Sequence, residues 1–293
     1  MSPVSALRGV VLETPDLEAS TRFYTEVWGL DLVGPRDPER RYFRGRGSEP
    51  WVLGLQRGPG HQLLRLRLAL RSLVDVDSAY ARLCAAGVVP RSCPAWLDGP
   101  GGYYGFDLVD PDKRVLELSA TTHKASPSTR RAPAPIRASH LVLNSPRPRD
   151  AVEFYRTMLG FTISDWYEKD AIIFLRCNND HHCVDIGQKS NTALNHLAFL
   201  VDDEAAVLSA GQQAIERGAV SVWGPGRHGP GGNVFSYFKD PADYVVEYTA
   251  ELIQIAPGES WLAKEWQRTP ATANVWGSGG PTPEAIRLMS GES

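Results

Sequence analysis

The chain has 293 residues, 42% hydrophobic and 22% charged, a composition typical of globular proteins and not of disordered or fibrous ones. Its formal net charge of −3 offers no basic field for nucleic acid or an anionic membrane. No apolar run approaches the roughly 20 residues of a membrane span and the first residues lack a signal-peptide core, so a cytoplasmic protein is expected.

The chain repeats itself at about half its length. An aromatic pair that ends in Tyr24 recurs at Tyr155, 131 positions later, and a glycine follows five positions after each tyrosine. The segment 110–120 matches 240–250 at an offset of 130. A nearly constant offset over about 110 residues predicts two copies of one domain.

Each copy predicts the same elements in the same order. In the second copy, an apolar strand that begins at His140 precedes an amphipathic helix at 149–159, and Gly160 is placed to end that helix. Further predicted elements of this copy are strands at 171–177 and 183–187, a strand at 196–201, a helix at 204–218, and strands at 234–238 and 244–250. Each copy therefore consists of two βαβββ units.

This order predicts an α+β fold in which four βαβββ units pair into two domains, each a curved sheet around a cavity. We place these domains at 1–122 and 136–251, with a connector rich in Ser, Thr, Pro and Arg between them. The tail at 252–293 has no counterpart in the first copy and carries three tryptophans, which favour burial. It is expected either to cover a pocket mouth or to pack on a neighbouring subunit of a homo-oligomer, a dimer or tetramer.

Two histidines open equivalent strands of the second copy. His140 begins the first strand of one unit, His196 begins that of the next, and Glu247 lies in the last strand. If the units pair around a pseudo-twofold axis, the imidazoles become symmetry mates and Glu247 can complete a set of two imidazoles and one carboxylate. That set suits non-haem Fe(II) and leaves coordination positions open. A lone histidine on an apolar strand is more often a core residue, but the repetition beside a carboxylate favours a metal.

The first copy serves as an internal control for this hypothesis. At the positions of the candidate ligands it has Gly9, Arg65 or Arg67, and Glu117. Glycine offers no ligand atom, and arginine is not deprotonated in proteins. Metal binding is therefore predicted for the second copy alone.

A specific motif occupies the segment 224–250: Gly226, His228, Tyr237, an Asp-Pro pair at 240–241 and Glu247. With these spacings the chain resembles the two-domain extradiol ring-cleaving dioxygenases of the vicinal oxygen chelate superfamily.

The resemblance covers about residues 5–251, and two positions depart from the family pattern. Ser236 stands where an apolar residue is usual, and Asp243 replaces a glycine in the turn after the Asp-Pro pair. Because Asp tolerates the left-handed conformation, this turn is expected to survive.

The resemblance implies a role for each matching residue. His140, His196 and Glu247 are similar to the family's metal ligands. His182, fourteen residues before His196, resembles the acid–base histidine, and His181 is the fallback because a slip of one residue reverses the face.

The remaining implied roles concern the substrate. His228 and Tyr237 resemble the catalytic pair that hydrogen-bonds a substrate hydroxyl and the bridging oxygen. Phe174 falls where relatives place an aromatic wall, and Asn233 is assigned to the substrate pocket. Trp223 stands where homoprotocatechuate-type enzymes have an arginine for the substrate carboxylate, so a catechol without a carboxylate there is expected, unless Arg176 or Arg227 takes over the anion.

The activity that the resemblance implies is extradiol cleavage of a catechol-type ring with O₂ and Fe(II), with Mn(II) as the alternative metal, in the degradation of aromatic compounds. The expected partners are the small-molecule catechol and O₂, with no nucleic acid and no membrane. Two other functions stay open: a metal-dependent isomerase or thiol transferase of the glyoxalase type, and a non-catalytic module that binds an aromatic ligand.

Overall fold

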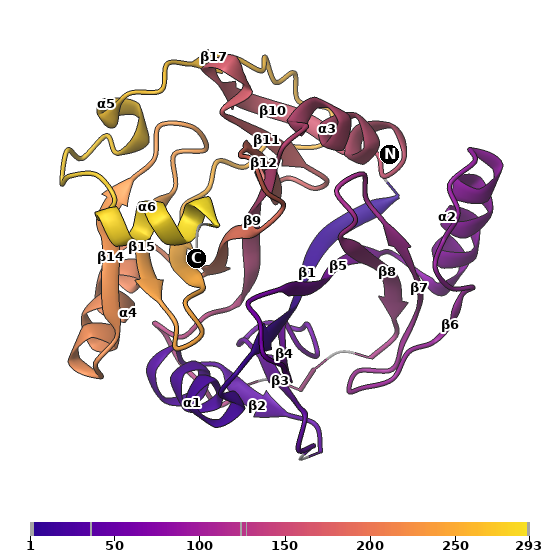
Figure 1. Ribbon diagram of the computed structural model, residues 1–293, viewed down its shortest axis with the longest axis horizontal. Coiled ribbons are helices and arrows are strands. Elements are labelled where there is room, and N and C mark those ends of the chain that lie inside the picture. The colour runs from indigo at the N-terminus through magenta and orange to yellow at the C-terminus, as the bar shows by residue number, and fades with distance from the viewer. Residues whose placement is uncertain (1–2, 36, 124, 127, 292–293) are drawn as a thin grey trace.

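The computed structural model describes residues 3–35, 37–123, 125–126 and 128–291 and contains an eight-stranded and a nine-stranded sheet, both curved (Figure 1). The first sheet belongs to the N-terminal copy and the second to the C-terminal copy. Helices are few and cover the outer faces, so the predicted α+β class is confirmed. Within the described ranges, no helix is long and apolar enough to cross a membrane.

The N-terminal sheet has the strand order β2-β3-β4-β1-β5-β8-β7-β6. Its strands are β1 (Val4–Thr14), β2 (Asp31–Val33), β3 (Arg40–Arg44), β4 (Leu53–Arg57), β5 (Leu63–Leu70), β6 (Ala95–Trp96), β7 (Tyr103–Val109) and β8 (Val115–Thr121). The helices of this copy are α1 (Leu17–Arg22), which continues into a π-helical turn η1 (Phe23–Val27), and α2 (Leu73–Ala85).

The C-terminal sheet has the order β14-β15-β16-β13-β9-β12-β11-β10-β17. Its strands are β9 (Arg137–Ser145), β10 (Thr162–Tyr167), β11 (Ile172–Arg176), β12 (Val184–Gln188), β13 (Leu194–Leu200), β14 (Val220–Arg227), β15 (Val234–Lys239), β16 (Val245–Ala250) and β17 (Glu265–Trp266). The helical segments are α3 (Pro148–Thr157), the 3₁₀ turn η2 (Glu168–Asp170), α4 (Glu204–Glu216), α5 (Pro270–Ala273) and α6 (Pro283–Ser290).

The first strands of the two units meet at the centre of each sheet. β1 pairs with β5 and β9 with β13, both antiparallel, and each of these strands also pairs in parallel with the last strand of a unit. The predicted pairing of units is thus confirmed. It sets β9 and β13 side by side near the middle of the sheet, with His196 opposite Val142, two residues from His140.

Glycines end the helices of the second copy as expected. Gly160 and Gly218 follow α3 and α4 with φ of 78° and 89°, a conformation that costs glycine little and other residues more. At its start, α4 is capped by Asp203, whose side chain accepts the N–H of Ala206.

The turn after the Asp-Pro pair survives without its glycine. Asp243 has φ of 65°, so the expected left-handed conformation is confirmed. Asp240 holds the turn together, because its Oδ1 accepts the N–H groups of Ala242 and Tyr244.

Reciprocal hydrogen bonds join the two copies. Tyr24 donates its hydroxyl to Asp240 Oδ2 at 2.8 Å, and Tyr155 donates to Asp110 Oδ2 at 3.4 Å. Each tyrosine thereby reaches the Asp-Pro turn of the opposite copy. One hydrophobic cluster runs across the junction, where Trp28 stacks on Tyr248 with ring centroids 3.7 Å apart.

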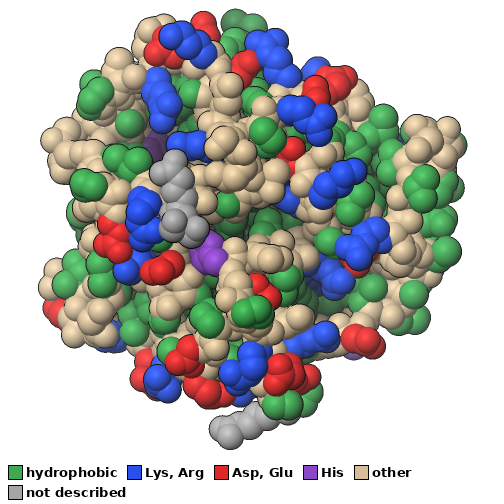
Figure 2. All heavy atoms as spheres, viewed as in Figure 1, with side chains coloured by type: hydrophobic (Ala, Val, Ile, Leu, Met, Phe, Trp, Pro, Cys, Tyr) green, Lys and Arg blue, Asp and Glu red, His purple; other side chains and the backbone are tan. Residues whose placement is uncertain are grey.

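The predicted domain limits at 122 and 136 stay predictions, although β8 ends at Thr121 and β9 begins at Arg137. The tail, gold to yellow in Figure 1, runs along the C-terminal sheet from β17, which pairs with β10, to α6, which packs against β13, β14 and β16. Charged side chains of both signs are interspersed on the face shown in Figure 2.

Candidate metal centre and catalytic cavity

Three elements of the C-terminal sheet bring the candidate ligands together. His140 lies on β9, His196 on the neighbouring β13, and Glu247 on β16, which pairs with β13. Glu247 Oε2 is 3.2 Å from His140 Nε2 and 3.4 Å from His196 Nε2. All three side chains are buried, and their candidate ligand atoms lie within 4.8 Å of one another.

The imidazoles are held with Nε2 toward the carboxylate. Asn195 Oδ1 lies 2.9 Å from His196 Nδ1 and accepts its proton, which leaves the lone pair on Nε2. Asn195 is fixed in turn, since its amide donates to Asn144 and to the carbonyl of Met289 in α6. Glu247 Oε1 accepts from Asn233 at 3.3 Å.

The protonation states match those of metal ligands. Burial lowers the pKa of His196 to about 3, so its imidazole is neutral. Burial alone would raise the pKa of Glu247, but the neighbouring imidazoles of His140, His196 and His228 outweigh it and lower the pKa to about 2. The cluster thus offers the neutral imidazole of His196 and the ionised carboxylate of Glu247.

One atom indicates that a cation belongs in this cluster. Glu247 Oε2 is buried and has no hydrogen-bond partner, although a buried carboxylate oxygen without one is costly. His196 Nε2, one of the two ring nitrogens that face it, is a lone-pair acceptor and cannot satisfy it. A divalent cation would satisfy all three atoms, and nitrogen and oxygen donors suit Fe(II) or Mn(II).

The cluster forms part of the wall of a cavity of about 360 Å³. The structure brings all six predicted catalytic and substrate residues to this wall: Phe174, His182, Trp223, His228, Asn233 and Tyr237. Neither Arg176 nor Arg227 lines it, because Arg176 bonds Ser164 and Arg227 pairs with Glu204 and Glu251.

His182, not His181, faces the cavity. The His182 ring contacts that of His140, with centroids 4.5 Å apart, and burial lowers its pKa well below the usual range. His181 is completely buried behind it, and its Nδ1 lies 3.0 Å from His182 Nδ1.

His228 and Tyr237 form a hydrogen-bonded pair on the opposite side of the cluster. His228 Nδ1 donates to the carbonyl of Ala273 at 2.7 Å, so Nε2 is free to accept from the Tyr237 hydroxyl at 3.1 Å. The same hydroxyl is 3.5 Å from His196 Nε2. Burial raises the pKa of Tyr237 well above its ordinary value, so the phenol keeps its proton as a donor.

Sequence reasoning missed part of the wall. Asp185 lines the cavity beside His182, and burial raises its pKa well above the usual range. Lys189 and Arg268 add two cations. The tail contributes several lining residues, which a repeat could not reveal because the first copy has no such tail: Arg268, Thr269, Pro270, Ala273, Pro281, Ile286 and Met289.

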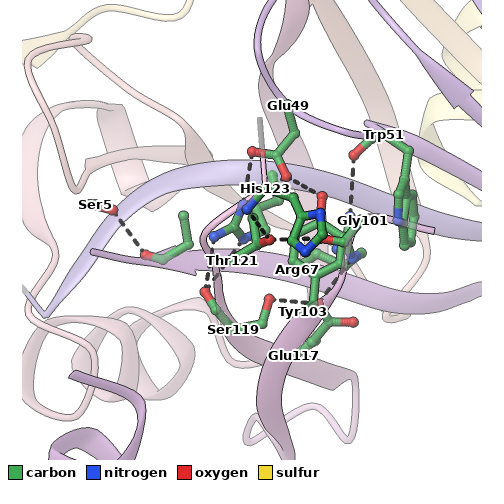
Figure 3. A network of polar contacts seen from close by, with 12 residues as sticks. Ser5, Glu49, Trp51, Arg67, Gly101, Tyr103, Glu117, Ser119, Thr121 and His123 are labelled. Carbon is green, nitrogen blue, oxygen red and sulfur yellow. Dashed lines mark hydrogen bonds and ion pairs between the residues drawn. The ribbon is translucent and has the colours of Figure 1, made fainter. Parts of the chain in front are cut away.

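The equivalent place in the N-terminal copy is filled by protein (Figure 3). Arg67 is completely buried there, with Nε 3.0 Å from Glu117 Oε1 and its guanidinium 3.4 Å above the Trp51 ring. Gly9 cannot carry a ligand, because a Cβ would come within 1.8 Å of the Val52 carbonyl oxygen. A fixed guanidinium thus stands where the C-terminal copy has its ligand cluster.

Related proteins identify the family. A model described as Glyoxalase/Bleomycin resistance protein/Dioxygenase superfamily matches residues 137–248, and one described as a glyoxalase-like domain matches 9–118. The crystal structure of the Mn(II)-bound glyoxalase from Novosphingobium aromaticivorans is 35% identical with a TM-score of 0.90, covering 97% of this chain and 94% of that one. The chain belongs to the glyoxalase/bleomycin resistance protein/dioxygenase superfamily.

Ring-cleaving members of this superfamily are similar along most of their length. Metapyrocatechase 2 from Cupriavidus necator is 28% identical over 291 residues, covering 90% of this chain and 86% of the relative. Homoprotocatechuate 2,3-dioxygenase from Arthrobacter globiformis shares the fold, with 19% identity, a TM-score of 0.84 and coverage of 95% and 90%. The superfamily inferred from the sequence motif is therefore confirmed.

Proposed function

We propose that this protein is an extradiol dioxygenase that opens a catechol-type ring with O₂ and Fe(II), or Mn(II), in the degradation of aromatic compounds. The observation that carries the proposal is the buried cluster of two imidazoles and a carboxylate at a mostly apolar cavity. The same wall presents three further groups that can hold or donate a proton: His182, His228 and Tyr237. The similarity to a metapyrocatechase supports this reaction class.

The metal, when bound to His140, His196 and Glu247, would supply open coordination positions and lower the pKa of the catechol hydroxyls. The chain's own groups hold the protons. His182 is neutral and faces the cavity, so it can accept a hydroxyl proton and later return it. The Tyr237 hydroxyl and His228 Nε2 can hydrogen-bond a substrate oxygen on the other side of the cluster.

The residues near Trp223 favour a substrate whose aromatic ring carries no charged substituent on that side. That indole is fixed by its bond to the Gly279 carbonyl at 3.0 Å and lies nearly parallel to the Tyr237 ring. Arg176 and Arg227 are engaged elsewhere, as described above. Alkyl, aryl, hydroxy and chloro catechols are therefore the first substrates to test, and a carboxylated catechol tests whether Lys189 or Arg268, the two cations of the cavity wall, can take an anion.

The test is turnover by protein that has been purified anaerobically and reconstituted with Fe(II) or Mn(II). With 4-methylcatechol, 2,3-dihydroxybiphenyl and hydroxyquinol in air, O₂ uptake and a yellow ring-opened product are expected. The His140→Ala variant should bind less metal and lose both signals. Stoichiometric metal and full activity in that variant would overturn the ligand assignment.

A glyoxalase-type isomerase is the second candidate, because the 35% identical relative is a Mn(II)-bound glyoxalase. The hemithioacetal of methylglyoxal and glutathione tests it directly. Isomerisation without O₂ uptake on any diol would replace the dioxygenase proposal. The protonated Tyr237 and the neutral His182 and His228 favour oxygen chemistry on a diol over that reaction.

A cytoplasmic location and a homo-oligomer, dimer or tetramer, remain part of the proposal. Leu262 in the tail is 85% exposed and Trp96 is 63% exposed, and a subunit contact would cover side chains of this kind. Sedimentation velocity at two protein concentrations would measure the oligomeric state. A monomer at both concentrations would exclude the homo-oligomer.

A further inference from the structure

A row of hydrogen-bonded side chains runs behind His182, away from the cavity. His182 Nδ1 lies 3.0 Å from His181 Nδ1, and His181 Nε2 lies 3.2 Å from Asp165 Oδ2. Asp165 is on β10, so the row ends at the strand that pairs with the tail strand β17. All three side chains are at most 3% exposed, which places the row in the protein interior.

The tail closes the far end of this row. Asp165 Oδ2 accepts the indole N–H of Trp266 at 2.8 Å, and Oδ1 accepts the backbone N–H of Lys264 at 3.0 Å. Trp261 packs edge-on against the His181 ring, with centroids 5.3 Å apart, and donates to the Ser164 carbonyl. Two of the tail tryptophans, Trp261 and Trp266, therefore contact residues of this row.

The hydrogen bonds define which atoms carry protons. Burial alone would raise the pKa of Asp165, but the bonds from His181, Trp266 and Lys264 outweigh it and lower the pKa, so the carboxylate only accepts.

It follows that His181 donates from Nε2 and, when neutral, has its lone pair on Nδ1. His182 must then donate from Nδ1, which leaves its own Nε2 unprotonated. That nitrogen lies 3.6 Å from Asp185 Oδ2, a cavity-lining oxygen without a partner.

We propose that Asp165 and His181 are positioning residues that set the tautomer of His182, so that its unprotonated Nε2 faces the cavity. This inference rests on the proposed function for the identity of the proton donor, a catechol hydroxyl. The tail takes part in the site through Trp266 and Lys264, in addition to lining the cavity.

The step that this arrangement serves is a single proton transfer. The O–H bond of the catechol hydroxyl breaks, an N–H bond forms at His182 Nε2, and the catechol becomes an anion. His182 becomes a cation whose Nδ1–H is already donated to His181, and the Asp165 carboxylate balances the charge through His181. An ordered partner of this kind fixes the imidazole and stabilises its cation, as in Ser-His-Asp triads.

The test compares Asp165→Asn with a matched control, Asp180→Asn. Asp180 is another buried carboxylate, immediately before His181, but its partners are Arg137, Asn178 and Gln254. In Asp165→Asn the negative charge is lost and one of the two acceptor oxygens becomes an NH₂ donor, so kcat should fall by about 10²-fold with KM within about threefold. Asp165→Glu, which keeps the carboxylate, should recover part of the rate, whereas Asp180→Asn should retain kcat.

A second readout needs no turnover. In the full chain loaded with diamagnetic Zn(II) and labelled with ¹⁵N-histidine, the His182 Nε2 resonance should be that of an unprotonated nitrogen. It should move toward the protonated range in Asp165→Asn but not in Asp180→Asn. Trp266→Phe removes the indole hydrogen bond to Asp165 but keeps an aromatic ring, so it should shift the His182 Nε2 resonance less. This variant also provides a test if Asp165→Asn does not fold.

An unchanged His182 tautomer in Asp165→Asn, or equal kcat losses in both Asn variants, would overturn the proposal. These outcomes are separate from a failure of the proposed function. If no diol is cleaved by the wild type, the dioxygenase proposal fails while the nitrogen resonances still decide the tautomer.

Discussion

Glu247 would connect a bound metal to the rest of the site, because one of its oxygens faces both imidazoles and the other is held by Asn233. Its replacement by glutamine removes the negative charge and half of the acceptor capacity. We predict that Glu247→Gln lowers Mn(II) or Fe(II) affinity by at least about 10²-fold, since even changes outside the ligand set cost 10–100-fold. Equilibrium dialysis with metal analysis measures this.

The matched control is Glu117→Gln, the equivalent position of the N-terminal copy. Glu117 pairs with Arg67 and Arg65, so the variant should keep the wild-type metal content. Metal loss of equal size in both variants would mean that the effect comes from misfolding.

Arg67 gives a prediction about stability. Arg67 and Glu117 are both buried and paired at 3.0 Å, so removal of Arg67 leaves Glu117 with the longer contact to Arg65, at 3.7 Å, as its ion pair. Arg67→Met should lower the free energy of unfolding by about 3–5 kcal/mol, and the double variant Arg67→Met with Glu117→Leu should regain much of it. Urea unfolding measures both, and a double variant less stable than the single one would contradict this account.

At the scale of single residues, the repeat made the ligand set predictable because it compared two copies of one frame. The same reasoning could not choose between His181 and His182. These residues lie in a bend between β11 and β12, where the alternation of a strand does not apply. Asp165 carried no signal in the sequence, because its role depends on a partner about a hundred residues away.

At the scale of elements, α6 supports the metal site from outside. The Met289 carbonyl accepts the amides of Asn195 at 2.7 Å and Asn144 at 3.0 Å, and Asn195 holds His196. A chain that ends at Thr282 should therefore bind metal about 10-fold more weakly, as expected for loss of outer-shell support.

The control for this truncation is Leu262→Ala, a tail residue that is 85% exposed. Its metal affinity should equal that of the wild type. Unchanged affinity in the truncated chain, measured by the same titration, would show that Asn195 does not need α6.

The helices and strands of the repeat could be predicted from periodicity and glycines, since each unit buries its own apolar face. The position of the tail could not. The expectation left open whether it covers the cavity or contacts a neighbouring subunit, and the structure has it lining the cavity. The pairing of β17 with β10 rests on two residue pairs, too few for a recognisable strand pattern.

At the scale of the whole molecule, the Asp-Pro turns lock the two copies together. Burial raises the pKa of Asp240 from 3.8 to about 6, despite the bond from Tyr24. Because the folded state holds the proton more tightly, the contribution of Asp240 to stability is fully present below about pH 4 and is lost as the pH rises through 6.

Between pH 4 and 7, the wild type should therefore lose about 2 kcal/mol of stability relative to Asp240→Asn, at 1.36 kcal/mol for each unit of pKa. Chemical unfolding of both proteins at each pH gives the difference. A difference that is constant with pH, or that grows in favour of the wild type, would contradict a raised pKa.

The repeat predicted two domains but not how they dock. The matching aromatic pairs at Tyr24 and Tyr155 were visible, yet nothing in either copy alone indicates that each tyrosine bonds the opposite Asp-Pro turn. Contacts between copies depend on how two finished surfaces fit, and a pattern within one copy does not encode that.

The central claim is that the ring is cleaved beside the diol and that both atoms of O₂ enter the product. One isotope measurement tests it most directly. The Fe(II)-loaded protein is mixed with 4-methylcatechol under ¹⁸O₂, and the product is analysed by mass spectrometry. The account predicts a yellow 2-hydroxymuconic semialdehyde-type product that carries two ¹⁸O atoms before exchange with water, and none from His140→Ala. A colourless muconate from cleavage between the hydroxyls, or no ¹⁸O in any product from a metal-loaded protein, would contradict it.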